Sequence, residues 1–255
     1  MSNGQPTIEF RDVSFALADG RKLLANLNLQ VNNGETLVLL GRSGSGKTTT
    51  MKLINRLIDP TSGEVRVDGK PTVEWDPIRL RRRIGYVIQE VGLFPHLTVE
   101  ENIGVVPRLE GWDTERIQAR ARALLTMVGL DADRFARRYP RELSGGQRQR
   151  VGVARALAAD PPVILLDEPF GALDPITRRE IQQEFKSLQQ ELGKTMVFVT
   201  HDIAEAFVLA TRIALLKDGE MILLGPPAEL IQSHHPEARA FAQCFHDSQS
   251  VGSPA

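Results

Sequence analysis

The stretch "TLVLLGRSGSGKTTT", residues 36 to 50, decides the fold. It begins with the short apolar run "TLVLL", which is typical of a strand buried on both faces of a parallel sheet. The run leads directly into a loop that contains three glycines, and then into a helix that we expect over roughly residues 47–58. A strand, a glycine loop and a helix in this order are the unit in which α/β proteins hold a phosphate.

The glycine loop matches the pattern G-x-x-x-x-G-K-[ST], with Gly41, Gly46, Lys47 and Thr48 at the defining positions. Glycines let backbone N–H groups point inward around phosphate oxygens, and the N-terminus of a helix adds the positive end of its dipole. In this pattern Lys47 places its charge on the β- and γ-phosphates, and the Thr48 hydroxyl is a ligand for Mg²⁺. A flexible glycine turn is the alternative, but the strand and helix on either side disfavour it. The residues expected to bind the nucleotide here are Gly41, Arg42, Ser43, Gly44, Ser45, Gly46, Lys47, Thr48 and Thr49.

A second buried strand ends in two carboxylates. In "VILLDEP", residues 163–169, four apolar residues are followed by Asp167 and Glu168. Ligands in open α/β sheets bind at the carboxyl ends of the strands. We therefore expect Asp167 to hold Mg²⁺, directly or through water, and Glu168 to act as the general base on the attacking water. Without the glycine loop upstream, an acidic pair that only faces solvent would be the better interpretation.

Two more polar residues follow predicted strands. Gln89 comes after "IGYVI", and His201 comes after "TMVFV". A glutamine at such a place can contact Mg²⁺ and the γ-phosphate, and a histidine can bind the γ-phosphate and orient Glu168 or the water. Each alone is as easily a structural strand end. Together with the carboxylates they predict a hydrolytic site in which Glu168, His201 and Gln89 are catalytic and Thr48, Gln89 and Asp167 bind the metal.

The rest of the chain alternates between the two kinds of secondary structure. The amino-terminal third is rich in strands with alternating apolar residues, and residues 97–158 are mainly helical. Beyond them, buried strands alternate with amphipathic helices, which predicts a mostly parallel sheet. "RIALLKDGEMILLG", residues 212–225, predicts a hairpin that turns at Asp218-Gly219. Residues 233–255 show no clear period, and we expect a short tail there.

Composition narrows the class of protein. Hydrophobic residues make up 42% of the 255 residues and charged residues 25%, as in folded globular domains. The 31 basic and 32 acidic residues give no overall charge that would attract nucleic acid. There is one cysteine, so the chain cannot form an internal disulfide. We expect no secretion signal and no membrane-spanning segment, because no apolar run approaches the ~20 residues that a bilayer requires.

A second glycine-rich loop, "RELSGGQRQRV" at residues 141–151, contains no lysine within its glycine core. Combined with the first loop, Gln89, "LLDEP" at 165–169, "ALD" at 172–174 and His201, it resembles the ATPase subunit of an ABC transporter over roughly residues 7–232. The resemblance implies an α/β P-loop NTPase fold of the ABC ATPase type. Its core sheet would be mostly parallel, with an N-terminal antiparallel β subdomain and a helical subdomain, at about residues 90–160, inserted before the signature motif.

The resemblance also implies a partner. Two copies would stack head to tail, so that each ATP lies between the first glycine loop of one copy and the second loop of the other. The residues that would meet the partner's nucleotide are Ser144, Gly145, Gly146, Gln147 and Asp174. The family usually stacks an aromatic ring on adenine, and here that position is Leu17, which lacks a π-face. Phe15 is better explained by sheet packing.

Longer stretches resemble the ATPases of osmoprotectant importers, which take up quaternary amines such as glycine betaine, carnitine and choline. This implies two transmembrane permease subunits, a separate substrate-binding protein and a peripheral location on the cytoplasmic face of the inner membrane. The stretch 89–112 resembles the surface that grips the permease, with Phe94, Pro95 and His96 near that groove. We expect an ATPase domain over residues 1–232 and a tail over 233–255, without the regulatory CBS modules that such ATPases often carry.

Three alternatives stay open from the sequence. The chain could energise an amino-acid importer or a lipid-trafficking system with the same fold. An ABC ATPase that acts on nucleic acid or ribosomes fits less well. Such ATPases usually carry two cassettes, zinc modules or long coiled-coil insertions, and we find none of these in the sequence.

Overall fold

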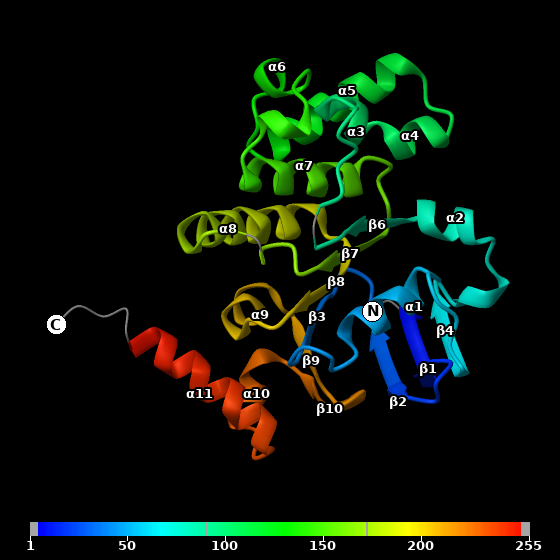
Figure 1. Ribbon diagram of the computed structural model, residues 1–255, viewed down its shortest axis with the longest axis vertical. Coiled ribbons are helices and arrows are strands. Elements are labelled where there is room, and N and C mark those ends of the chain that lie inside the picture. Colours follow the sequence, from blue (N-terminus) through cyan, green and yellow to red (C-terminus); the bar gives the residue numbers. More distant parts are fainter. Residues whose placement is uncertain (1–4, 90, 172, 251–255) are drawn as a thin grey trace. The chain divides into compact units, whose positions relative to one another are not determined.

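The computed structural model describes residues 5–89, 91–171 and 173–250, with side chains described up to residue 245 (Figure 1). The chain divides into two compact units. Unit 1 combines residues 1–77 with residues 195–255, and unit 2 consists of Ile78–Lys194. Unit 2 is larger than the helical subdomain expected at about 90–160, because it also contains two strands and a long helix.

Unit 1 contains an antiparallel sheet with the strand order β2-β1-β4-β5. Its strands are β1 (Ile8–Ala16), β2 (Lys22–Val31), β4 (Ser62–Val67) and β5 (Lys70–Pro71). In β2, Leu27, Leu29 and Val31 are buried while the residues between them are exposed, so the alternating pattern places one apolar face inward. This confirms the strand-rich, antiparallel start of the chain.

The second set of strands in unit 1 holds the glycine loop. Strand β3 (Thr36–Leu40) pairs in parallel with β8 (Thr195–Thr200) on one side and with β9 (Arg212–Lys217) on the other. All five residues of β3 are buried, as the continuous apolar run predicts. Strand β10 (Glu220–Gly225) pairs antiparallel with β9 and confirms the hairpin at Asp218-Gly219.

The helices of unit 1 are α1 (Lys47–Ile54), the 3₁₀ turn η1 (Thr72–Glu74), α9 (Ile203–Leu209), α10 (Pro227–Gln232) and α11 (Pro236–Ser250). Helix α1 is shorter than the expected 47–58. It ends where Arg56 takes the left-handed backbone conformation at φ +51°, which a right-handed helix cannot continue through.

The expected tail is wrong for residues 236–250, which form α11. Ala238 and Ala242 lie four residues apart and are buried, and Phe245 stacks on Phe207 of α9 with ring centroids 4.4 Å apart. The buried stripe is made of small residues, so its hydrophobic periodicity is weak in the sequence. Residues 251–255 of the expected tail lie outside the described residues.

Unit 2 combines a pair of parallel strands with several helices. Strand β6 (Ile84–Val87) pairs in parallel with β7 (Val163–Asp167). The helices are α2 (Pro77–Arg82), α3 (Val99–Ile103), α4 (Val105–Leu109), α5 (Thr114–Met127), α6 (Ala132–Phe135), the 3₁₀ turn η2 (Pro140–Glu142), α7 (Gly145–Leu157) and α8 (Pro175–Leu192). Helix α7 packs against α3, α5 and β6.

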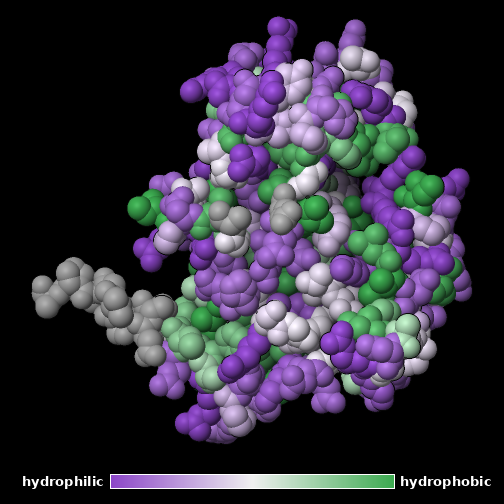
Figure 2. Space-filling model, viewed as in Figure 1, coloured by the Kyte–Doolittle hydropathy of each residue, from purple (hydrophilic) through white to green (hydrophobic). Residues whose placement is uncertain are grey.

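Within the stretch 97–158 that was expected to be mainly helical, Gly104 separates α3 from α4. A Cβ at Gly104 would lie 2.6 Å from Cγ2 of Ile117, so the glycine permits α5 to approach closely. Hydrophobic residues reach the surface at α2 and α4, where Ile78 and Leu109 are more than half exposed (Figure 2). No helix among the described residues is both long and apolar enough to cross a lipid bilayer.

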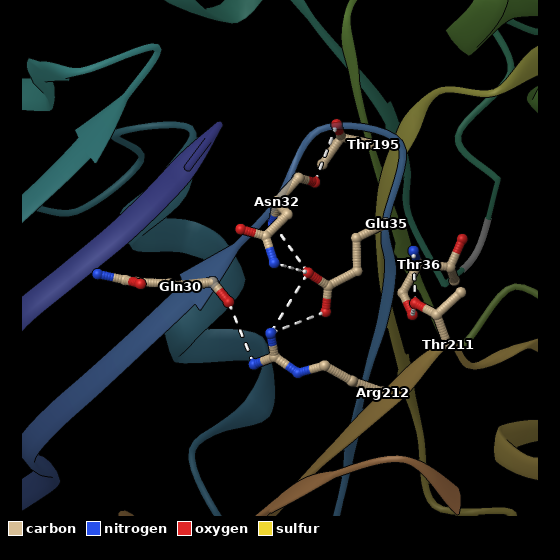
Figure 3. A network of polar contacts seen from close by, with 7 residues as sticks. All are labelled: Gln30, Asn32, Glu35, Thr36, Thr195, Thr211 and Arg212. Atoms are coloured by element: carbon tan, nitrogen blue, oxygen red, sulfur yellow. Dashed lines mark hydrogen bonds and ion pairs between the residues drawn. The ribbon is translucent and has the colours of Figure 1, made fainter. Parts of the chain in front are cut away.

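A buried carboxylate ties together the strand ends of unit 1 opposite the glycine loop (Figure 3). Glu35 accepts hydrogen bonds from the backbone N–H of Asn32 at 2.8 Å and from its side chain at 3.1 Å, and pairs with Arg212 at 3.3 Å. The backbone N–H of Gly34 donates to Thr195 Oγ1 at 3.0 Å. These contacts hold the β2–β3 turn against the starts of β8 and β9. They thereby fix the start of β3, the strand that leads into the glycine loop.

Candidate functional site

The glycine loop in unit 1 has the backbone geometry that its pattern predicts. Gly41, Gly44 and Gly46 have φ values of +155°, +80° and +102°. A Cβ at Gly41 would lie 2.3 Å from the carbonyl oxygen of Leu216, and one at Gly46 would lie 2.6 Å from Cδ2 of Leu24. At these two positions no residue with a side chain fits without moving its surroundings. A Cβ at Gly44 would meet nothing within 4 Å, so that part of the loop has free space around it.

Lys47 is buried within the curve of this loop. The residue is 5% exposed, and Nζ donates hydrogen bonds to the carbonyl oxygens of Gly41 at 2.7 Å and Arg42 at 2.8 Å. Helix α1 begins at Lys47, and Gly46 provides no side-chain cap for its first turn. The loop therefore combines a buried ammonium with the N-terminus of a helix, and this donor set fits a phosphate group. Thr48 and Thr49 are half-buried in the first turn of α1.

His201 directly follows β8, as the sequence predicts, and it is exposed. The residues on either side of it are fixed. Thr200 Oγ1 donates to Glu205 at 2.5 Å and accepts the backbone N–H of Asp202 at 2.9 Å, while Asp202 caps α9 by accepting from Ala204 N at 2.8 Å. The backbone on either side of the exposed His201 is thus held by hydrogen bonds.

Leu17 lies half-buried in the turn between β1 and β2. Its N–H donates to Arg21 O, and its carbonyl accepts from Gly20 N, both at 2.9 Å. Phe15 pairs with Leu24 across the β1–β2 ladder, in agreement with the sheet-packing interpretation. Leu17 is therefore an aliphatic side chain in the first hairpin, where the family usually carries an aromatic ring.

In unit 2 the two strand ends bring predicted site residues together. Asp167 is the last residue of β7 and is 7% exposed. Gln89, two residues beyond β6, donates from Nε2 to Glu168 Oε2 at 3.3 Å. Glu168 has φ +44°, a conformation that residues other than glycine adopt at a cost and that recurs at functional sites. The predicted general base, Glu168, is thus hydrogen-bonded to Gln89, one of the two residues predicted to contact the γ-phosphate.

Tyr86 was not predicted as a site residue. It lies on β6, and burial together with the neighbouring Asp167 carboxylate raises the pKa of its hydroxyl to about 12. A hydrogen bond joins the Tyr86 hydroxyl to Asp167. The available signal was its position three residues before Gln89 on the strand next to β7, but the partner lies 81 positions further along the chain.

The second glycine loop forms the start of α7. Ser144 is its N-cap: Ser144 Oγ accepts from Gln147 N at 3.2 Å, and Gln147 Oε1 accepts from Ser144 N at 3.0 Å. This is a capping box, so both side chains are partly occupied within the chain. A Cβ at Gly146 would lie 3.0 Å from Cγ2 of Thr177, which gives this glycine a packing role against α8. Gly145 is exposed.

Asp174 also serves as a helix cap. Its carboxylate accepts from the backbone N–H groups of Thr177 at 3.0 Å and Ile176 at 3.1 Å at the start of α8. The backbone hydrogen bond from Thr177 lowers the pKa of Asp174. The first residue of the predicted "ALD" motif, residue 172, lies outside the described residues.

The stretch after Gln89 borders a groove of about 310 Å³ within unit 2. Phe94 is 43% exposed and lies at this groove together with Tyr86 and Arg155. Arg155 of α7 holds the segment by donating to the carbonyls of Gly92 at 2.7 Å and Val91 at 2.5 Å. Pro95 and His96 are exposed but are not among the residues that line the groove. Residue 90 of this stretch lies outside the described residues.

The residues predicted to hold Mg²⁺ have suitable chemistry. Thr48, Gln89 and Asp167 all offer oxygen atoms, which are the ligands that this cation prefers. Among the described residues, no group of three or more histidine, cysteine or acidic side chains could hold a metal ion by itself. The predicted site needs only one side chain of these types, Asp167. The remaining ligands would be the Thr48 hydroxyl, the Gln89 amide and phosphate oxygens.

Comparison with known proteins gives a consistent picture. Residues 24–171, more than half of the chain, match the family described as ABC transporter. The chain is 53% identical over 226 residues to the glycine betaine/carnitine/choline transport ATP-binding protein OpuCA of Bacillus subtilis, which covers 89% of this chain and 59% of that protein. It is 50% identical over 245 residues to the glycine betaine uptake system ATP-binding protein YehX of Escherichia coli, covering 96% of this chain and 78% of that protein.

A dimeric structure of the ATP-binding cassette MJ0796, in a post-hydrolysis state bound to ADP and Pi, matches with a TM-score of 0.77 and 40% identity. The match covers 86% of this chain and 98% of that one. It confirms the predicted cassette fold. The chain spans about 59% of the length of OpuCA and of other curated relatives that it matches.

The contact between Tyr86 and Asp167 makes a prediction that can be tested by absorbance. In a spectrophotometric titration near 295 nm, the wild-type chain should show a phenolate component centred near pH 12. Tyr86→Phe should remove that component. Asp167→Asn should move it to lower pH, because the carboxylate that disfavours the phenolate is gone. An unchanged titration in Asp167→Asn would contradict the contact.

Proposed function

The chain belongs to the ABC transporter family, and on that premise we propose that it is the ATP-hydrolysing subunit of an importer for a quaternary-amine osmoprotectant of the glycine betaine, carnitine or choline type. The observation that carries the ATPase part is the loop whose buried Lys47 ammonium lies against the carbonyls of Gly41 and Arg42. The names of the relatives OpuCA and YehX support the substrate class. They favour this substrate class over an amino-acid or lipid system.

In this proposal the first loop binds the β- and γ-phosphates. Lys47 exchanges its two carbonyl partners for phosphate oxygens, and the backbone N–H groups at the start of α1 point toward the same anion. Thr48, Gln89 and Asp167 would hold Mg²⁺. When bound, this ion would neutralise negative charge on the β- and γ-phosphates. The half-buried Leu17 would pack on the adenine as an apolar surface without ring stacking.

Glu168 would take a proton from the attacking water while the bond between the γ-phosphorus and the bridging oxygen breaks, so that ADP departs with the electron pair. Gln89 donates to Glu168 Oε2 at 3.3 Å and would thereby orient the carboxylate that accepts the water's proton. His201 would donate to a γ-phosphate oxygen and orient the water or Glu168. The hydrogen bonds of its neighbours Thr200 and Asp202, which fix the end of β8, support such a role.

A second copy of the chain would complete each site. The capping box occupies the acceptor side of Ser144 and the amide oxygen of Gln147. The Ser144 O–H and the backbone N–H groups of Gly145 and Gly146 would then be the donors toward the partner's γ-phosphate. Asp174 would act at the same interface through its cap on α8. Dimeric structures of a related cassette support this arrangement.

The chain would bind peripherally, on the cytoplasmic face of the inner membrane, to two transmembrane permease subunits, and a separate substrate-binding protein would supply these with substrate. The groove at Phe94 and the exposed apolar residues Ile78 and Leu109 support a docking surface on unit 2. Pro95 and His96 would act at its margin. Nucleic acid is not part of this proposal, because the chain has a formal net charge of −1.

Glu168→Gln should abolish steady-state ATP hydrolysis while leaving ATP bound, because the amide cannot accept the proton from water. The ATP-loaded variant should elute as a dimer in size-exclusion chromatography. Lys47→Ala is the contrasting variant: it should lose nucleotide binding itself and remain a monomer with ATP. Hydrolysis by Glu168→Gln at more than about one tenth of the wild-type rate would overturn the base assignment.

The substrate class requires an experiment on the whole assembly. A pull-down of the tagged chain from membranes should recover two permease subunits, and the associated binding protein should bind glycine betaine, carnitine or choline when titrated by calorimetry. A binding protein that takes up amino acids but no quaternary amine would contradict the substrate class while leaving the ATPase assignment intact. Recovery of a lipid-carrier protein would contradict it in the same way.

A further inference from the structure

The outer side of the glycine loop contacts a carboxylate from a distant part of the chain. Glu237, in the first turn of α11, accepts a hydrogen bond from Arg42 Nε at 2.6 Å and lies 3.9 Å from Lys217 Nζ. The Glu237 side chain is 9% exposed, whereas that of Arg42 is 71% exposed. Glu237 lies beyond residues 24–171, the range that matches the family. Glu237 is not among the site residues predicted from the sequence.

The position of Glu237 is fixed by the packing of its own helix. The next turns of α11 bury Ala238 and Ala242, and Phe245 stacks on Phe207 of α9. The backbone N–H of Glu237 donates to His235 Nδ1 at 3.2 Å. A carboxylate in the first turn of a helix is also favoured by the helix dipole. The packing of α11 therefore holds this carboxylate next to Arg42.

From Glu237 a short series of contacts leads to the lysine of the loop. Glu237 holds the Arg42 side chain, and the Arg42 carbonyl accepts from Lys47 Nζ at 2.8 Å. On the neighbouring stretch of the loop, the Ser45 carbonyl accepts from Gly219 N at 3.3 Å. A cavity of about 340 Å³ is bordered by loop residues 42–45, by residues 216–218 and by Glu237. Gly219 and Glu237, both from the carboxyl-terminal part of the chain, thus also hold the loop in place.

We propose that Glu237 is a positioning residue for nucleotide binding, which holds the first half of the glycine loop in its phosphate-competent conformation through Arg42. The proposal rests on the proposed function, since it requires that the loop binds ATP and ADP. If a loop reaches its competent conformation only part of the time, the measured dissociation constant rises by the inverse of that fraction. Removing the Glu237 carboxylate should therefore weaken nucleotide binding without changing the residues that do the chemistry.

The test is the dissociation constant for ADP with Mg²⁺, measured by calorimetry on the full chain. ADP is the probe because it avoids both hydrolysis and the dimer that ATP would form. Glu237→Gln should raise this constant at least about threefold, the size expected for loss of a partly exposed ion pair. Glu237→Asp, which keeps the charge, should restore part of the affinity. In steady-state hydrolysis, KM should rise while kcat stays within about twofold of wild type.

Glu229→Gln is the matched control. Glu229 occupies the first turn of α10 as Glu237 does in α11, but it is exposed. Its substitution removes the same charge and should leave ADP binding unchanged. A double-mutant cycle isolates the pair: Arg42→Gln should weaken binding by itself, and adding Glu237→Gln should cause little further loss.

The outcomes separate the two proposals. Failure of the wild-type chain to bind ADP would overturn the proposed function. Normal binding by wild type, together with unchanged or tighter binding by Glu237→Gln, would overturn the role of Glu237. Additive losses in the Arg42 and Glu237 double variant would also overturn it, because they would show that the residues act independently. If Glu237→Gln unfolds, the exposed Arg42→Gln variant decides, and unchanged ADP binding in it would contradict the proposal.

Discussion

The buried ammonium of Lys47 is the constraint on which the rest of the structure depends. A cation that is 5% exposed needs partners, and the carbonyls of Gly41 and Arg42 accept hydrogen bonds from it. The chain can turn so tightly only because Gly41 and Gly46 lack a Cβ where Leu216 and Leu24 approach. Strand β3, buried along its whole length, and helix α1 fix the two ends of this turn. A loop arranged in this way is suited to an incoming phosphate.

Unit 2 concentrates the acid–base groups at the ends of its two parallel strands. Glu168 takes a left-handed backbone conformation, and Gln89 holds one of its oxygens. Asp167 is buried next to the Tyr86 hydroxyl, which is a hydrogen-bonding partner for its carboxylate. Gln89 and Tyr86 are uncharged neighbours of these two carboxylates. Carboxylates held in this way are suited to two different tasks, binding a metal ion and accepting a proton.

The sequence predicts whatever depends on neighbouring residues. The loop around Lys47, the strand before it and the strand ends at Asp167 and His201 follow from short patterns, and the structure places them accordingly. Contacts between distant residues could not be predicted. Tyr86 and Asp167 are 81 positions apart, and Arg42 and Glu237 are 195 positions apart. Helix α11 was missed because its buried stripe begins with two alanines, which give little hydrophobic periodicity.

The second glycine loop, like the first, leads into a helix, but it lacks the lysine. Its capping box already uses the acceptor groups of Ser144 and Gln147. We propose that this loop completes a site whose lysine belongs to another copy. Hydrolysis by a mixture of two inactive variants tests it directly. Ser144→Arg chains keep an intact first loop, and Lys47→Ala chains keep an intact second loop, so mixed dimers should contain one complete site and hydrolyse ATP at a rate well above the sum of the two variants alone. A mixture that stays as inactive as its components, although mixed dimers are detected, would contradict the claim.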